Sequence, residues 1–133
     1  MQFPQLESIK SKHPRLSPKL DALANYIGGE LNEGRTRIVP ALAAVALKQG
    51  EAETLALLML FENAGVLTHQ YELICKRSNA VLATVSSLTE VEDEFPVYCQ
   101  LCDCEHGDDD VRAELVFQVA QSLLQDYRHH AVA

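Results

Sequence analysis

The stretch EAETLALLMLFENAGVLTHQYELIC, residues 51–75, decides the fold. Its first fourteen residues are rich in Leu and Ala and contain no Gly or Pro, and Gly65 follows them directly. This pattern is typical of a helix that ends at a glycine. From residue 70 to residue 75, β-prone and polar residues alternate with the period of two that a strand requires. The chain is therefore expected to pass from helix to strand soon after Gly65.

Two further helices are predicted upstream. Ser17 and Pro18 have the form of a helix start. The apolar residues that follow share one helical face: Leu20, Leu23, Ala24, Ile27 and Leu31. A short β-branched run, residues 36–39, leads to Pro40 and a second helix, for which Gly50 suits a left-handed C-terminal position. The helix that precedes Gly50 and the helix that precedes Gly65 together span about 25 residues, which is the spacing of a helix-turn-helix.

The downstream sequence predicts mainly β structure. A polar turn at residues 76–79 joins two β-prone runs and indicates a hairpin. The further expected elements are a short helical turn from Ser87, extended chain at 95–99, a strand at 111–119 and a helix at 120–130. The fold class is thus α+β, with an N-terminal arm (1–16), a domain of helices and hairpin (17–86) and a Cys-bearing β appendage with a C-terminal helix (87–133).

The order helix, short strand, helix, turn, helix and hairpin resembles a winged helix-turn-helix, and the segment ENAGVL resembles the exit of its third helix into the first wing strand. The segments FPVYCQLCDCEH and DDDVRAELVFQV are similar to a small zinc-ribbon-like appendage that is fused to winged helices in bacterial proteins. The resemblance covers roughly residues 17–120. Some proteins of this kind are accessory components of defence systems, so the resemblance implies a role in antiviral defence.

The resemblance also implies a zinc site made from two C-x2-C knuckles, each with two thiolates. The second knuckle is intact as Cys99-x2-Cys102, whereas the first has Cys75 but carries Ser78 in place of its second cysteine. Either of two residues could supply a fourth ligand, because thiolate and imidazole both suit zinc. They are Cys104, which we prefer as another thiolate, and His106 as the alternative.

Two other interpretations of the cysteines remain open. The zinc site could have been lost, leaving thiols that are buried as small apolar groups. Alternatively, Cys99 and Cys102 could form a redox pair, although the neighbouring Asp103 and Glu105 would raise the pKa of these thiols.

Charge is distributed unevenly along the chain, whose net charge is −8. Residues 1–48 hold seven Lys and Arg against four Asp and Glu, whereas residues 49–126 hold three against fifteen. No Lys or Arg lies between Gln49 and Cys75, so specific DNA binding through the third helix is not expected, since base and phosphate contacts rely on these side chains. A candidate binding surface for phosphates or acidic partners remains in the basic first third: Lys10, Lys12, Arg15, Lys19, Arg35 and Arg37.

The expected function is that of a non-catalytic protein-interaction adaptor or accessory subunit, with a DNA-binding transcriptional regulator as the alternative. No catalytic motif, such as a nucleophile elbow or a phosphate-binding loop, is present in the sequence. No apolar run is long enough to span a membrane. The chain has no export signal, so we expect a cytoplasmic protein with reduced thiols and zinc as its one candidate cofactor. A protein partner is expected, and the sequence leaves a homodimer open.

Overall fold

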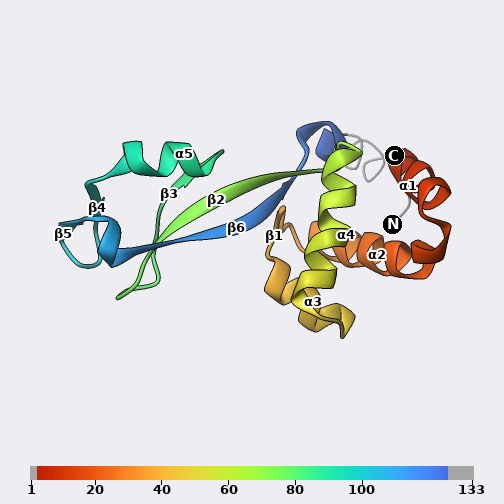
Figure 1. The fold of residues 1–133 in the computed structure, drawn as a ribbon, viewed down its shortest axis with the longest axis horizontal. Helices are drawn as coiled ribbons and strands as arrows, with labels where there is room; N and C mark the ends of the chain where they lie inside the picture. Colours follow the sequence, from red (N-terminus) through yellow and green to blue (C-terminus); the bar gives the residue numbers. More distant parts are fainter. Residues whose placement is uncertain (1–2, 126–133) are drawn as a thin grey trace. The chain divides into compact units, whose positions relative to one another are not determined.

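A computed structural model of the chain describes residues 3–125. These residues form a mixed α+β structure (Figure 1). They divide into two compact units, which we describe separately. Residues 1–68 and 117–133 belong to the helical unit, and residues 69–116 form the β unit.

Residues 3–66 of the helical unit contain four α-helices, a 3-10 turn and a short strand. In chain order these are α1 (Pro4–Lys12), η1 (Pro14–Leu16), α2 (Ser17–Asn32), β1 (Arg37–Ile38), α3 (Pro40–Leu47) and α4 (Glu51–Asn63). The three helices expected between residues 17 and 64 are confirmed, and Gly65 ends the last of them with a φ of +83°. Residues 121–125 are also helical, and the rest of the expected final helix lies outside the described residues.

Apolar side chains on the inner faces of these helices make the core of the helical unit. The apolar stripe of α2 is buried along its whole length, as its spacing predicts. Leu57, Leu58 and Phe61 of α4 are buried as well, and the rings of Phe61 and Phe3 meet edge to face at 5.8 Å between centroids. The helical unit thus has a continuous hydrophobic core that requires no other stabilising group.

The N-terminal residues differ from the expected arm. Residues 4–12 form α1, which starts with Pro4 at its first turn and buries Leu6 and Ile9. Phe3 is buried directly before it. The apolar residues of this segment are few, but they are spaced for one helical face, and their burial is what orders the segment.

The link between α3 and α4 also differs in one detail from the expectation. Lys48, rather than Gly50, adopts the left-handed conformation after α3, with φ 55° and ψ 46°. Gly50 is extended, with φ −66°, and precedes α4 as its N-terminal cap residue. A left-handed lysine is less favourable than a left-handed glycine, because its Cβ crowds the backbone.

The β unit contains the expected hairpin. Strands β2 (Leu67–Cys75) and β3 (Val81–Val85) pair antiparallel, with Tyr71 opposite Val85, and the turn at residues 76–79 joins them. The remaining elements are α5 (Leu88–Val91), η2 (Glu92–Glu94), β4 (Val97–Cys99), β5 (Cys104–His106), η3 (Asp108–Asp110) and β6 (Val111–Val119). β4 and β5 form a second, two-stranded sheet.

The division into units differs from the expected boundary between residues 86 and 87. The larger sheet has the strand order β1-β6-β2-β3, and its two nine-residue strands, β2 and β6, each begin in one unit and end in the other. The boundary therefore falls inside these strands, where no change of composition marks it. No described helix has both the length and the apolar character needed to cross a bilayer.

Candidate metal centre

Four side chains with metal-binding atoms gather in the β unit: Cys75, Cys99, Cys102 and His106. Their thiol sulfurs and one imidazole nitrogen all lie within 4.8 Å of one another. Three of the four residues are buried, and Cys102 is half-buried. We call this group the Cys3His centre. It agrees with the expectation that the chain's thiols could bind a metal.

The hairpin places Cys75 at the end of β2, directly before the turn. Asn79 adopts a left-handed conformation with φ 63°, which asparagine tolerates better than most residues, and this allows the chain to return into β3. Within the turn, the backbone N–H of Ser78 donates a hydrogen bond to Cys75 Sγ at 3.3 Å. The turn thus fixes the position of the sulfur.

The second pair of cysteines lies on the β4–β5 hairpin. Cys99 ends β4, and Cys102 lies in the turn that follows. Asp103 is left-handed with φ 54°, and this reverses the chain so that β5 runs back along β4 with Cys104 opposite Cys99. The C-x2-C spacing therefore directs both sulfurs toward the hairpin residue Cys75.

The structure brings His106 rather than the preferred Cys104 into the group. Cys104 is exposed, whereas His106, two residues further along β5, is buried with Nε2 3.5 Å from Cys75 Sγ. Because the chain turns at Asp103, Cys104 lies at the start of the return strand, and the longer imidazole side chain reaches the other sulfurs. His106 Nδ1 lies 3.7 Å from Asp110 Oδ2, an arrangement typical of metal-bound histidines, whose second nitrogen faces a carboxylate.

The distances within the group fit a tetrahedral zinc ion. Zinc binds sulfur at about 2.3 Å and nitrogen at about 2.0–2.1 Å, so a tetrahedron has S···S edges of about 3.8 Å and S···N edges of about 3.6 Å. Cys75 Sγ and Cys102 Sγ lie 3.7 Å apart, and Cys75 Sγ and His106 Nε2 lie 3.5 Å apart. These two distances match the edges of a zinc tetrahedron, and the remaining ones lie within 4.8 Å.

The thiols differ in how readily they lose their protons. Hydrogen bonds from Ser78, first from its hydroxyl and then from its backbone N–H, lower the pKa of Cys75 to about 6. A hydrogen bond from the backbone N–H of Cys102 lowers the pKa of Cys99, whereas burial and the neighbouring thiols raise the pKa of Cys102 to about 11. The hydrogen bond to Cys99, and then the charge of Cys75, raise the pKa of His106. Without a metal, these pKa shifts favour the thiolate forms of Cys75 and Cys99 and the protonated forms of Cys102 and His106.

This chemistry favours a structural metal ion over a catalytic one. A tetrahedral ion held by four protein ligands keeps no open position for water or substrate, whereas catalytic zinc sites keep one. The interpretation of the thiols as buried small apolar groups does not explain why a buried imidazole contacts the cysteines. Zinc held here would stabilise the β unit by joining the two hairpins.

The basic residues expected to form a binding surface are partly occupied by contacts within the chain. Lys10 pairs with Asp21 at 3.0 Å, Lys19 with Glu53, and Arg35 with Glu30. Arg37 is exposed on β1, where it lies opposite Gln118 in the pairing with β6. Lys12 and Arg15 have no carboxylate partner among the described residues. The structure therefore assigns much of this positive charge to ion pairs.

Sequence reasoning missed two residues of the metal centre. Ser78 was interpreted only as a poor ligand, yet its N–H supports Cys75 and its Oγ lies 3.7 Å from Cys99 Sγ. Asp110 was not considered as a partner of His106, although its position four residues after His106 was a signal. The backbone N–H of Lys76 donates to the Asp110 carbonyl at 3.0 Å, and this bond attaches the acidic turn to the first hairpin.

Comparisons of the chain with protein-family models, with curated proteins and with solved structures found no match.

Proposed function

We propose that the chain is a non-catalytic protein-interaction module, an adaptor or accessory subunit, in which zinc at the Cys3His centre supports the β unit. One observation carries the interaction role. In α3 the alanines Ala43 and Ala44 are buried, while the larger side chains of Leu42 and Val45 are 61% and 77% exposed. Helices normally bury their large aliphatic side chains and expose small or polar ones, so this inversion favours a partner that covers them.

The chemistry of α3 limits what that partner can be. The helix PALAAVAL contains no charged or polar side chain, so its outer face offers neither an ion pair nor a side-chain hydrogen bond. The next helix, α4, exposes Ala52, Ala56 and Met59, and it also lacks Lys and Arg. We infer that the partner presents an apolar, uncharged segment of protein.

The winged-helix resemblance is compatible with the same proposal. The third helix of that fold corresponds to α4, which would then not serve for DNA recognition. In DNA-binding members of such folds, this helix supplies base contacts through polar and basic side chains. Apart from Asn63 at its C-terminal end, the exposed residues of α4 are small, apolar or acidic, which disfavours a polyanion. DNA-binding regulation remains the alternative proposal, resting on Lys12 and Arg15, and a homodimer formed through α3 is a third outcome of the test.

Peptide display can test the interaction role with the zinc-loaded protein as bait. We expect the wild-type chain to select peptides with a regular apolar face, and the double variant Leu42→Ser, Val45→Ser to lose them. The double variant Val81→Ser, Leu88→Ser is the matched control, because Val81 and Leu88 are exposed aliphatic residues of the β unit. It should keep the selected peptides.

Two measurements separate the alternatives. A mobility-shift assay at low and physiological salt detects DNA binding, whose affinity falls steeply with salt. Analytical ultracentrifugation detects a homodimer. Specific DNA binding without peptide selection would overturn the proposal, and so would peptide selection that the α3 variant leaves unchanged.

A further inference from the structure

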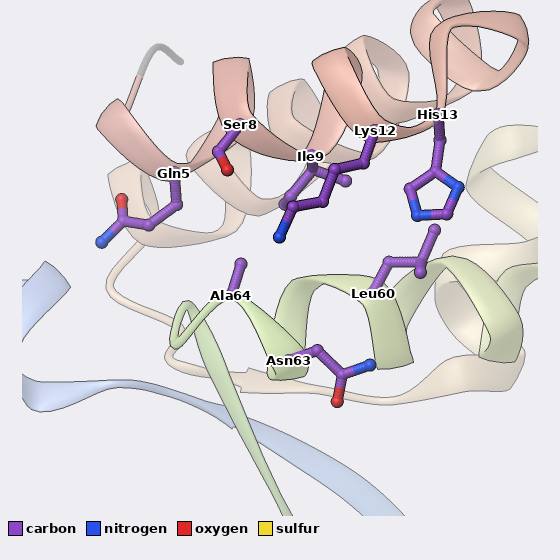
Figure 2. Close-up of a pocket in the computed structure, with 8 residues that line it drawn as sticks. All are labelled: Gln5, Ser8, Ile9, Lys12, His13, Leu60, Asn63 and Ala64. Carbon is purple, nitrogen blue, oxygen red and sulfur yellow. The ribbon is translucent and has the colours of Figure 1, made fainter.

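The helical unit contains a cavity that the interaction role does not use. It has a volume of about 260 Å³ and lies between α1 and the end of α4 (Figure 2). This is slightly below the range of about 300–1,000 Å³ that is usual for small-molecule sites, so it suits a ligand of about a dozen heavy atoms. The lining residues are Gln5, Ser8, Ile9, Lys12, His13, Leu60, Asn63 and Ala64.

The lining combines apolar walls with neutral polar side chains, a histidine and a lysine. Ile9, Leu60 and Ala64 supply the walls, and no carboxylate lines the cavity. In Figure 2, the side chains of Lys12 at the end of α1 and of His13 directly after it lie on the side that faces α4. Unlike Lys10 on the same helix, which pairs with Asp21, Lys12 has no carboxylate partner among the described residues. The Lys12 ammonium is exposed and therefore accessible to a ligand with a negative charge.

The opposite end of the cavity carries an unsatisfied acceptor. Gln5 Oε1 is buried and accepts no hydrogen bond from any described residue. Buried polar atoms without a partner are rare, because each costs about 1–3 kcal/mol in folded proteins. Seven residues of α1 separate Gln5 from Lys12, a rise of about 10 Å along the helix. Gln5 and Lys12 therefore line different parts of the cavity.

We propose that this cavity binds a small organic carboxylate that carries a hydrogen-bond donor at its far end. The carboxylate pairs with Lys12, the body of the ligand lies between Ile9 and Leu60, and the donor reaches Gln5. This site is separate from the Cys3His centre and from the exposed face of α3.

Three probe compounds test the chemistry of the site by NMR titration of the ¹⁵N-labelled full chain. They are 4-hydroxyphenylacetate, phenylacetate without the donor, and 4-hydroxyphenylacetamide without the charge. We expect saturable shifts of α1 and α4 amides with 4-hydroxyphenylacetate, and binding of the neutral amide that is weaker by about tenfold, the usual scale for a hydrogen bond to a charged group. Phenylacetate should bind a few-fold more weakly, in line with a neutral hydrogen bond.

Matched variants test the assignment to Lys12. Lys12→Gln should weaken 4-hydroxyphenylacetate binding about tenfold, and Lys12→Arg should retain it. Lys48→Gln removes an exposed lysine elsewhere in the helical unit and should leave the affinity unchanged. The spectrum of each free variant verifies its fold, and Lys12→Arg keeps the test decisive if Lys12→Gln is destabilised.

Several results would overturn the proposal. They are the absence of saturable shifts, shifts confined to residues outside α1 and α4, equal binding of the acid and the amide, or equal loss of binding in Lys12→Gln and Lys48→Gln. Equal binding of the two acids would overturn the role of Gln5.

Discussion

The helical unit and the β unit reach a folded state by different means. Of the 27 buried hydrophobic residues among residues 3–125, twenty belong to the helical unit and seven to the β unit, and two of those seven are the cysteines Cys75 and Cys99. Small domains with few buried apolar residues generally need disulfides or a metal. The comparison teaches that apolar packing accounts for the helical unit, whereas the β unit buries few apolar residues and gathers a group of side chains that could hold a metal ion.

The largest expected effect is that of metal removal, which should unfold the β unit and leave the helical unit folded. Structural zinc in zinc-finger peptides binds with about 10–16 kcal/mol at pH 7, and this free energy is largely folding free energy. We therefore expect chelation, or Cys99→Ser, to abolish slow amide exchange across residues 69–116 while the helices α2 and α4 remain protected. Hydrogen exchange, combined with elemental analysis, measures both effects.

Cys104→Ser is the control for this experiment, because Cys104 is exposed and lies outside the centre. It should keep one zinc per chain and an unchanged exchange pattern. If the wild type contained no zinc and chelation changed nothing, the cysteines would be buried apolar groups instead.

A substitution that removes core volume from the helical unit should destabilise that unit and leave the metal centre unchanged. Leu58 is fully buried in α4, and Leu58→Ala should reduce the free energy of unfolding of the helical unit by about 2–5 kcal/mol. Zinc content should stay unchanged. Met59→Ala, at the half-exposed neighbouring position, should cost no more than about 0.5 kcal/mol. Chemical denaturation followed by circular dichroism gives both values, and similar losses in the two variants would contradict the assignment of the core.

Acid should weaken metal binding through the protons of the thiols. Cys75, with its pKa lowered to about 6, is already a thiolate at pH 7, whereas Cys102, with its pKa raised to about 11, must lose its proton to bind. Zinc affinity should therefore rise from pH 6 to pH 8, with fewer than three thiol protons released per ion at pH 8. Calorimetry in buffers of different ionisation enthalpy measures this number. Release of three thiol protons would contradict the assigned order of the pKa values.

The smallest expected effect concerns the helical unit alone. Lys48→Gly replaces a left-handed lysine at φ 55° and should stabilise this unit by about 0.5–1 kcal/mol. Lys48→Ala also removes the side chain but keeps the Cβ, so it should give no such gain. Thermal unfolding of the zinc-loaded protein distinguishes the two, and equal midpoints for both variants would argue against backbone strain at residue 48.

Periodic patterns allowed much of this structure to be predicted. Three features depend only on residues that are close together in the sequence: the apolar stripe of α2, the glycine after α4 and the polar turn at residues 76–79. All three predictions are confirmed. The helix α1 escaped prediction because its burial depends on contacts such as that of Phe3 with Phe61, 58 positions further along the chain.

The candidate site shows the same limit of local reasoning. The C-x2-C spacing identified Cys99 and Cys102, and the lone Cys75 was correctly grouped with them. The choice between Cys104 and His106 depended on the left-handed turn at Asp103, which composition does not specify. A nonlocal arrangement of two hairpins determined the fourth residue.

The exposure of Cys104 has a practical consequence. The other three thiols belong to the Cys3His centre, whereas Cys104 faces solvent. A maleimide reagent should therefore modify one thiol per chain in the zinc-loaded protein and four after chelation and unfolding of the β unit. Intact-mass spectrometry of alkylated protein would thus report, in a mixed population, the fraction of molecules whose centre is filled.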